Sequence, residues 1–304
     1  MDNITVALLI GYAITGIVAG TLGGLIGIGG GVIVVPALTL IFHKDAQLAV
    51  AASLFQMIFI ATSSAYGHYK NGYILKAVVI RLVPVAVVSA IVGVLVGSCV
   101  PGNILMKIFA VFLVYTSVDT GWRLVTKLLK KQPAREPISE FTPRNNWTIP
   151  TVAVSMGFSC GVLGIGGGAI AVPMLNKFLD LPMKNAVANS SAAIFFLSIV
   201  ATITKLIYIS THGITVHTAA GPSLLHWYDV LIVGGLLAPT SFIGGRLGAH
   251  LAKVSPTRVI QAIFIALMLY SAYDMWTKSE KMTIHPDPAP AKPAAQAPAT
   301  PGAS

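Results

Sequence analysis

The sequence has 304 residues, of which 55% are hydrophobic and 10% are charged. Because a soluble domain is typically about 25% charged, this composition excludes an ordinary soluble enzyme or binding module. The formal net charge is +10, but the sequence has no basic domain with interleaved aromatic residues, and this argues against nucleic-acid binding. We therefore expect an all-α polytopic membrane protein.

The first half of the chain contains five apolar segments. They cover residues 4–22, 24–42, 47–66, 74–97 and 104–122. A helix needs about 20 apolar residues to span the bilayer, and the first two segments are short, so we expect them to form a broken or hairpin-like element. Asp2 precedes the first segment where a signal peptide would carry basic residues, and we therefore expect residues 4–22 to be a membrane segment.

A basic loop, residues 123–147, divides the chain, as the positive-inside rule predicts for a cytoplasmic loop. Its basic residues are Arg123, Lys127, Lys130, Lys131, Arg135 and Arg144. Five further apolar segments follow at 148–161, 163–179, 186–209, 229–251 and 258–276. We expect a first repeat at 1–122, a second at 148–277, and a Pro/Ala-rich disordered tail at 278–304.

A glycine-rich phrase of 16 residues occurs twice, at residues 24–39 and 161–176. Gly31 aligns with Gly168, so the offset between the copies is 168 − 31 = 137. Farther along the chain, Pro84 aligns with Pro239 at an offset of 239 − 84 = 155. The second half therefore has 155 − 137 = 18 extra residues, which fall within 208–227. The chain is a duplicated unit with one insertion.

An odd number of membrane crossings in each half would invert the second repeat relative to the first. With 123–147 inside, five crossings place the basic region 68–76 inside and 98–103, which lacks Lys and Arg, outside. The loop charges therefore favour inverted repeats with about 8–10 membrane segments and both termini outside. Lys278 and Lys281 count against an outer C-terminus.

The repeated phrase also carries a family resemblance. Its pattern G-x-x-G-I-G-G-G-x-I-x-V-P is followed in each copy by Ala-Val-Ala-x-Ser, at 49–53 and 186–190. Together these motifs resemble the TauE/SafE family of sulfite exporters over residues 5–276. The resemblance implies a transporter of small, often sulfur-containing anions in the bacterial inner membrane.

Glycine and proline interrupt helices, and in secondary transporters duplicated interruptions indicate the substrate site. If 32–41 and 169–178 are half-helices, the glycines form their N-terminal turns, where backbone N–H groups and the helix dipole suit an anion. The alternative is that the glycines only permit close helix packing. The predicted substrate-binding glycines are Gly29, Gly30, Gly31, Gly166, Gly167 and Gly168.

Polar residues at the start of the next apolar segment in each half can add donors to this site. The predicted residues are Ser53, Gln56, Asn189, Ser190 and Ser191. Buried serines also bond to their own helix backbone, so only some of these residues are expected to face the substrate.

Lys205 lies inside an apolar segment, and its repeat partner is His68, since 205 − 137 = 68. Either residue could attract the anion or carry a proton, because an ionisable group within the membrane indicates function. The alternative for Lys205 is that its long side chain carries the ammonium group to the membrane–water interface. Arg81 and Arg246 fall near the expected cytoplasmic ends of membrane segments, so we expect their side chains to extend to the interface.

The sequence contains no Walker lysine, catalytic triad or metal-ligand cluster, so we predict no cofactor, no metal and no enzymatic activity. Its two cysteines, Cys99 and Cys160, have no metal-binding spacing. Cys160 precedes the second glycine phrase, and its alternatives are a small packing residue or a thiol that contacts a sulfur substrate.

The predicted function is a secondary transporter that exports sulfite or an organosulfonate. The alternatives are proton-coupled uptake of a related anion, a membrane sulfur relay that uses Cys160, and a structural scaffold. The expected partners are the anion and the lipid bilayer, with proton coupling and a homodimer left open and no nucleic acid.

Overall fold

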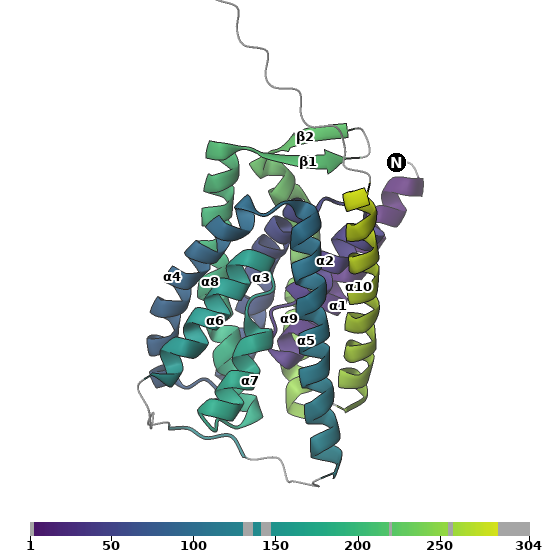
Figure 1. Ribbon diagram of the computed structural model, residues 1–304. Coiled ribbons are helices and arrows are strands. Elements are labelled where there is room, and N and C mark those ends of the chain that lie inside the picture. Colours follow the sequence, from purple (N-terminus) through teal and green to yellow (C-terminus); the bar gives the residue numbers. More distant parts are fainter. Residues whose placement is uncertain (1–2, 130–135, 141–146, 219–220, 255–257, 285–304) are drawn as a thin grey trace, which may run out of the picture.

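The computed structural model describes residues 3–129, 136–140, 147–218, 221–254 and 258–284. Figure 1 shows a helical bundle. The first half contains α1 (Asn3–Ile26), α2 (Gly31–Pro36), the π-helix η1 (Ala37–Ile41), α3 (Ala46–Lys70), α4 (Lys76–Cys99) and α5 (Gly102–Leu129). The second half contains α6 (Thr148–Leu163), α7 (Gly168–Phe178), α8 (Met183–His212), β1 (Ile214–Thr218), β2 (Gly221–Leu225), α9 (Trp227–Val254) and α10 (Arg258–Ile284).

Six of the described helices are long and apolar enough to cross a membrane, judged by length and composition. They are Val6–Ile26, Ala46–Lys70, Lys76–Cys99, Gly102–Trp122, Met183–His212 and Trp227–Ala252. Two shorter apolar helices, Gly31–Ile41 and Thr148–Leu163, adjoin the glycine phrases, where the sequence predicted broken elements. The expected all-helical, multi-pass membrane fold is confirmed.

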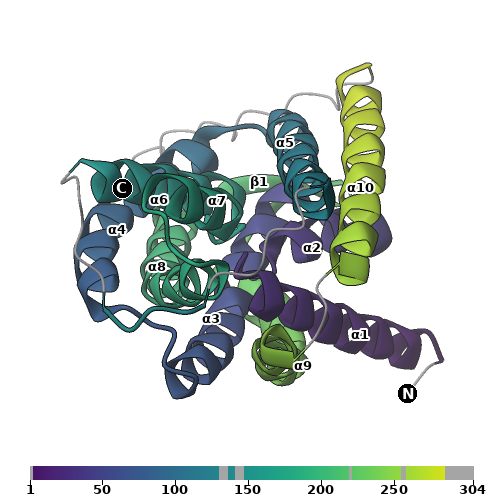
Figure 2. The same ribbon diagram turned by 90° about the horizontal axis from the view of Figure 1, so that it is seen from below.

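Helices of the first half pack against helices of the second half. Helix α1 packs along α9, and α6 of the second half packs along α4 (Figure 2). Gly20 lies against the carbonyl of Ser241, and Gly157 lies against that of Ala86, so closely that a Cβ on either glycine would overlap the oxygen. These contacts are equivalent, because 20 + 137 = 157 and 86 + 155 = 241. Small residues permit such close approach in membrane bundles, and here they do so at matching places in both halves.

Equivalent helices of the two halves run in opposite directions. Lys205, near the end of α8, contacts Gln47 at the start of α3. Ser279, near the end of α10, donates to the carbonyl of Asn103 at the start of α5, and Figure 1 shows these two helices side by side. An inverted duplication requires such opposite directions. The inverted relation itself stays a prediction.

A small β-hairpin occupies the inserted stretch 208–227, and the sequence analysis did not predict it. Strands β1 and β2 pair antiparallel. Ile214 and Val216 alternate with polar residues and are buried, in a cluster that includes Ala51 of α3 and Val230 of α9. This alternation is the period of a half-buried strand, so the insertion folds onto the end of the bundle where α3 begins.

Two helices continue beyond the ends that the sequence predicted. Helix α5 runs into the basic loop as far as Leu129, and α10 reaches Ile284. Residues 278–284, expected to belong to the disordered tail, are therefore helical, because no helix-breaking proline occurs before Pro286. The rest of that tail and residues 130–135 and 141–146 of the basic loop lie outside the described residues.

Candidate functional site

Each glycine phrase forms a break between two helices. Helix α1 ends at Ile26 and α2 begins at Gly31, while α6 ends at Leu163 and α7 begins at Gly168. The two copies have the same backbone pattern. Positive φ angles occur at Gly27 (76°), Gly29 (90°), Gly30 (82°), Gly164 (66°), Gly166 (80°) and Gly167 (67°). Glycine adopts this left-handed conformation without steric cost. The prediction that these glycines begin two half-helices is confirmed.

The two breaks cross each other in the buried centre of the bundle. Gly31 lies against the carbonyl of Gly164, and its repeat partner Gly168 lies against the carbonyl of Gly27, at distances that leave no room for a Cβ. The Ser53 hydroxyl donates to Gly164 O at 2.7 Å, and the Ser190 hydroxyl donates to Gly27 O at 2.9 Å. Ser53 and Ser190 therefore each hold the break of the opposite half.

Asn189 supports the loop that precedes α4. Its Oδ1 accepts from the N–H of Leu75 at 3.0 Å, and its Nδ2 donates to the carbonyl of Asn185 at 2.7 Å. Asn185, which the sequence analysis missed, donates to the carbonyls of Tyr73 (3.0 Å) and Ile138 (2.9 Å). Both asparagine side chains thus hold the α3–α4 connection, and Asn185 also holds the 136–140 segment at the start of α8.

Gln56 and Ser191 are the remaining predicted polar residues. Both are buried. The Gln56 Nε2 donates to Ser241 Oγ on α9, and its Oε1 has no partner among the described residues. Of the five predicted polar side chains, Gln56 therefore has a buried acceptor that remains available.

Lys205 is buried at the end of the bundle that carries the hairpin, with 2% of its surface exposed. Its ammonium group donates to Gln47 Oε1 at 2.7 Å and to Ser98 Oγ at 2.8 Å. Gln47 in turn donates to the carbonyls of Gly97 (3.0 Å) and Val100 (2.6 Å) at the end of α4. The alternative that Lys205 reaches the surface is wrong, because its ammonium group points into contacts with α3 and α4.

His68 occupies the equivalent position in the first half and is 1% exposed. Its Nε2 lies 3.2 Å from the carbonyl of Gly24 in α1, and its Nδ1 has no partner among the described residues. The two intramembrane basic residues therefore differ in environment. Lys205 bonds to two neutral side chains, whereas His68 contacts the backbone and keeps one nitrogen unpaired within the described structure.

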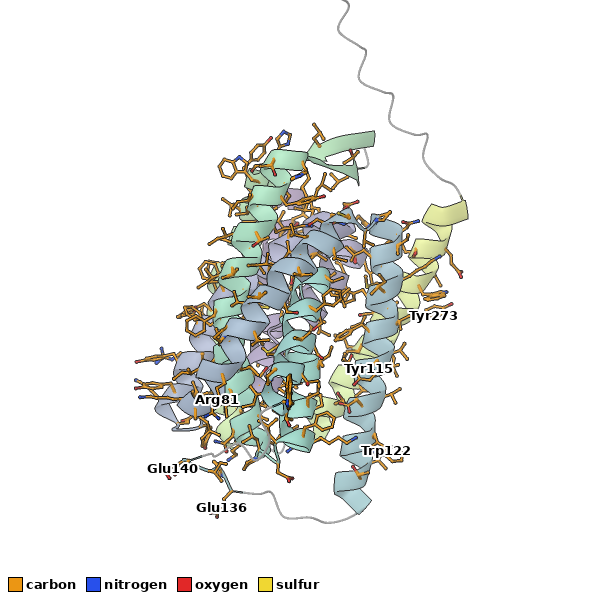
Figure 3. All side chains as sticks on the ribbon, turned by 60° about the vertical axis from the view of Figure 1, so that its left-hand side comes forward. Arg81, Tyr115, Trp122, Glu136, Glu140 and Tyr273 are labelled. Atoms are coloured by element: carbon orange, nitrogen blue, oxygen red, sulfur yellow. The ribbon has the colours of Figure 1, made fainter. Side chains whose placement is uncertain are left out.

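The arginines expected near membrane ends are exposed. Figure 3 shows Arg81 at the end of the bundle where Glu136 and Glu140 also lie. The guanidinium of Arg246 lies 5.8 Å from the ring centre of Tyr66. These positions match the expectation that both arginines reach an interface and do not line the breaks.

Cys160 is fully buried, and its sulfur contacts the backbone N–H of Gly166 inside the second break. Cys99 is exposed, with its sulfur 3.5 Å from the hydroxyl of Tyr208. Among the described residues, no group of three or more His, Cys, Asp or Glu side chains could hold a metal ion.

Broken helices that meet inside a membrane bundle occur in many secondary transporters, where they form the substrate site. The family model described as "Sulfite exporter TauE/SafE" matches residues 12–275. The chain belongs to this family and is a multi-pass membrane protein of the cytoplasmic membrane.

Several relatives are named as membrane transporters. "Probable membrane transporter protein MamO" of Magnetospirillum gryphiswaldense is 24% identical over 297 residues, which are 90% of this chain and 45% of that protein. "Probable membrane transporter protein YunE" of Bacillus subtilis is 28% identical over 280 residues, 84% of this chain and 93% of that protein. A "Probable membrane transporter protein" of Haemophilus influenzae is 27% identical over 273 residues, 87% and 97% of the two chains.

The chain thus spans less than half the length of the MamO protein, at 45%. None of these names states a substrate. No solved structure matches the chain significantly.

Proposed function

We propose that the chain is a secondary transporter that exports a small sulfur-containing anion, such as sulfite or an organosulfonate, across the cytoplasmic membrane. The observation that carries this proposal is the crossing of two glycine breaks in the buried centre of a bundle of the sulfite exporter family. The names of the relatives support membrane transport and leave the substrate open.

The two halves of this transporter are an inverted repeat. The antiparallel directions of α3 and α8 and of α5 and α10 support this arrangement. The charge of the 123–147 loop places that loop in the cytoplasm. The hairpin lies at the opposite end of the bundle from Glu136 and Glu140 (Figure 3), so it is on the outer side.

The anion is bound beside the first turns of α2 and α7. The first N–H groups of a helix have no partner within that helix, and the helix dipole adds about half a positive charge. Gly29–Gly31 and Gly166–Gly168 provide these turns and permit close approach. Ser53 and Ser190 act as positioning residues, because their hydroxyl groups hold the opposite breaks.

Two buried basic residues attract the anion on its way to and from the breaks. Lys205 lies at the hairpin end, which is the outer side in this proposal, and His68 lies at the opposite end of α3. Desolvating an anion in the membrane is costly unless donors or positive charge replace its water. The Lys205 ammonium group, which donates to the neutral oxygens of Gln47 and Ser98, supplies such a charge.

The membrane potential makes export of such an anion favourable. One elementary charge that crosses 100 mV corresponds to about 2.3 kcal/mol. A sulfite dianion that leaves a cell with a negative interior therefore gains about 4.6 kcal/mol per 100 mV. Export needs no coupled ion at this potential, whereas uptake of the same dianion does.

The test is efflux from proteoliposomes loaded with sulfite, thiosulfate, sulfoacetate or taurine. We expect at least one of these compounds to leave vesicles that contain the protein faster than empty vesicles, and flux of a charged substrate to follow an imposed potential. If none moves faster than in empty vesicles, the proposed substrate class is wrong.

Proton-coupled uptake is the second candidate, favoured by the Nδ1 of the buried His68, which has no partner among the described residues. An imposed pH gradient distinguishes the two candidates. Uptake coupled to protons accelerates when the outside is acidic, whereas export driven by potential alone responds to voltage in the absence of a pH gradient.

A further inference from the structure

Met57 of α3 and Ile194 of α8 occupy the same place in the two halves, since 57 + 137 = 194. Met57 is 0% exposed and Ile194 is 1% exposed. Each lies four residues, about one helical turn, beyond the serine that holds the opposite break, since 57 − 53 = 4 and 194 − 190 = 4. Their place at the centre of the duplicated structure is therefore set by the same elements that position the breaks.

Both side chains contact both glycine breaks. A Cβ at Gly29 would lie 3.0 Å from the sulfur of Met57 and 3.4 Å from Cδ1 of Ile194. A Cβ at Gly166 would lie 2.6 Å from the same sulfur and 3.3 Å from Cγ2 of Ile194. The two side chains consequently occupy the space between the breaks, and neither carries a charge or a hydrogen-bond donor.

Each of these residues is followed on its own helix by one of the buried basic residues. His68 lies 68 − 57 = 11 residues beyond Met57, and Lys205 lies 205 − 194 = 11 residues beyond Ile194. In an α-helix, 11 residues correspond to about three turns and about 16 Å, so each pair lies on one helix face. Because α3 and α8 are antiparallel, the basic residues lie on opposite sides of Met57 and Ile194.

We propose that Met57 and Ile194 form a central apolar gate that separates an outer compartment at Lys205 from an inner compartment at His68 and limits the bulk of the transported anion. This inference rests on the proposed function, because it assigns the gate to the same transport route. The anion is bound on either side of these two side chains and crosses when they separate.

The chemistry of the two side chains fits this role. A hydrophobic constriction stops ions because water and hydrated ions do not remain in contact with it. Methionine is unbranched and rotates about three side-chain bonds, whereas the β-branched isoleucine is stiff at χ1. Met57 is therefore the side chain that moves, and Ile194 is the fixed surface against which it closes.

The selectivity of this gate is tested in proteoliposomes with sulfite and the bulkier benzenesulfonate. We expect Met57→Ala to raise the benzenesulfonate-to-sulfite flux ratio about tenfold, the discrimination that one or two methylenes in a fitted contact supply. Met57→Leu preserves the volume, and Met106→Ala removes a buried methionine on α5, so both should retain the wild-type ratio. An unchanged ratio in Met57→Ala, or an equal change in Met106→Ala, overturns the gate.

A second measurement needs no transported substrate. The full chain carries Cys99→Ser, Cys160→Ala and Met57→Cys. The new thiol at position 57 is treated with a charged, membrane-impermeant thiol reagent from each side of the vesicle. We expect slow labelling while Ile194 is present and faster labelling when Ile194→Ala is added, because the hydrophobic constriction is then wider. Labelling that is fast with Ile194 intact rejects the gate even if Met57→Ala does not fold. Slow labelling with no flux of any tested anion rejects the proposed substrate class alone.

Discussion

Lys205 of α8 and Gln47 of α3 are joined by a buried hydrogen bond of 2.7 Å between Nζ and Oε1. The same glutamine donates to the carbonyl groups of Gly97 and Val100, which end α4. One intramembrane cation thus connects three helices at the hairpin end of the bundle. At the equivalent position in the first half, the Nε2 of His68 lies within hydrogen-bond distance of a backbone carbonyl of α1.

Lys205→Met removes this cation and retains a side chain of similar length. We expect anion flux in proteoliposomes to fall by at least about tenfold, because an ion that enters the membrane loses an interaction that offsets part of its desolvation. Stability should fall by only about 1–3 kcal/mol, the cost of a buried acceptor left unpaired at Gln47. The matched control is Lys177→Met at an exposed lysine of α7. Equal flux in both variants would contradict a role for Lys205 in transport.

Gln47→Leu should lower the stability of the protein more than Lys205→Met does. It leaves the Lys205 ammonium group with fewer acceptors and removes two bonds to the end of α4. A buried charged group that loses an acceptor costs more than a neutral group that loses a donor, so Gln47→Leu should destabilise the protein more than Lys205→Met.

Thermal unfolding in detergent measures both variants and their combination. We expect the double variant to be less destabilised than the sum of the single variants, because the unpaired ammonium group is gone. Strict additivity would mean that the two side chains do not act together.

Gly166→Ala tests the fit of the second break. The new methyl group would lie 2.6 Å from the Met57 sulfur at a residue with φ of 80°, so we expect loss of flux and lower stability. Gly29→Ala meets the same sulfur at 3.0 Å and should be milder in both respects. The control is Gly235→Ala in α9, where nothing lies within 4 Å, and there alanine should add about 0.5–1 kcal/mol of helix stability. Tolerance of all three changes would contradict the described packing of the breaks.

Cys160→Ser distinguishes transport from a sulfur relay. The thiol is fully buried and contacts the backbone N–H of Gly166, a contact that a serine hydroxyl can replace. We expect the variant to retain most of its flux because serine can replace the contact. Even its complete loss would contribute only about 0.5–1.5 kcal/mol, or at most about tenfold. Complete loss of activity in a variant that elutes and unfolds like the wild type would favour the relay.

The order of the helices and the position of both breaks could be predicted from the sequence. Apolar length and positive-φ glycines are properties of a short stretch of chain, so the predicted half-helices 32–41 and 169–178 agree closely with Gly31–Ile41 and Gly168–Phe178. The short strands of the hairpin escaped prediction because only a few alternating residues in the 18-residue insertion indicate them.

The partners of the site residues could not be predicted in the same way. Ser53 and Ser190 stand at matching places in the motif, but only the fold shows that each bonds to the opposite break. Met57 and Ile194 carried no local signal, because an apolar residue in an apolar helix faces lipid or protein without any change in the pattern of the sequence.

A duplicated membrane protein whose glycine phrases interrupt two helices could be predicted without the fold, because those features depend on local composition and backbone conformation. The crossing of the breaks, the inward direction of Lys205 toward Gln47 and the position of Met57 and Ile194 between the breaks are visible only in the folded chain. The physical reason is that a lipid-facing surface is as apolar as the packed interior, so hydrophobic periodicity does not indicate which helix faces meet.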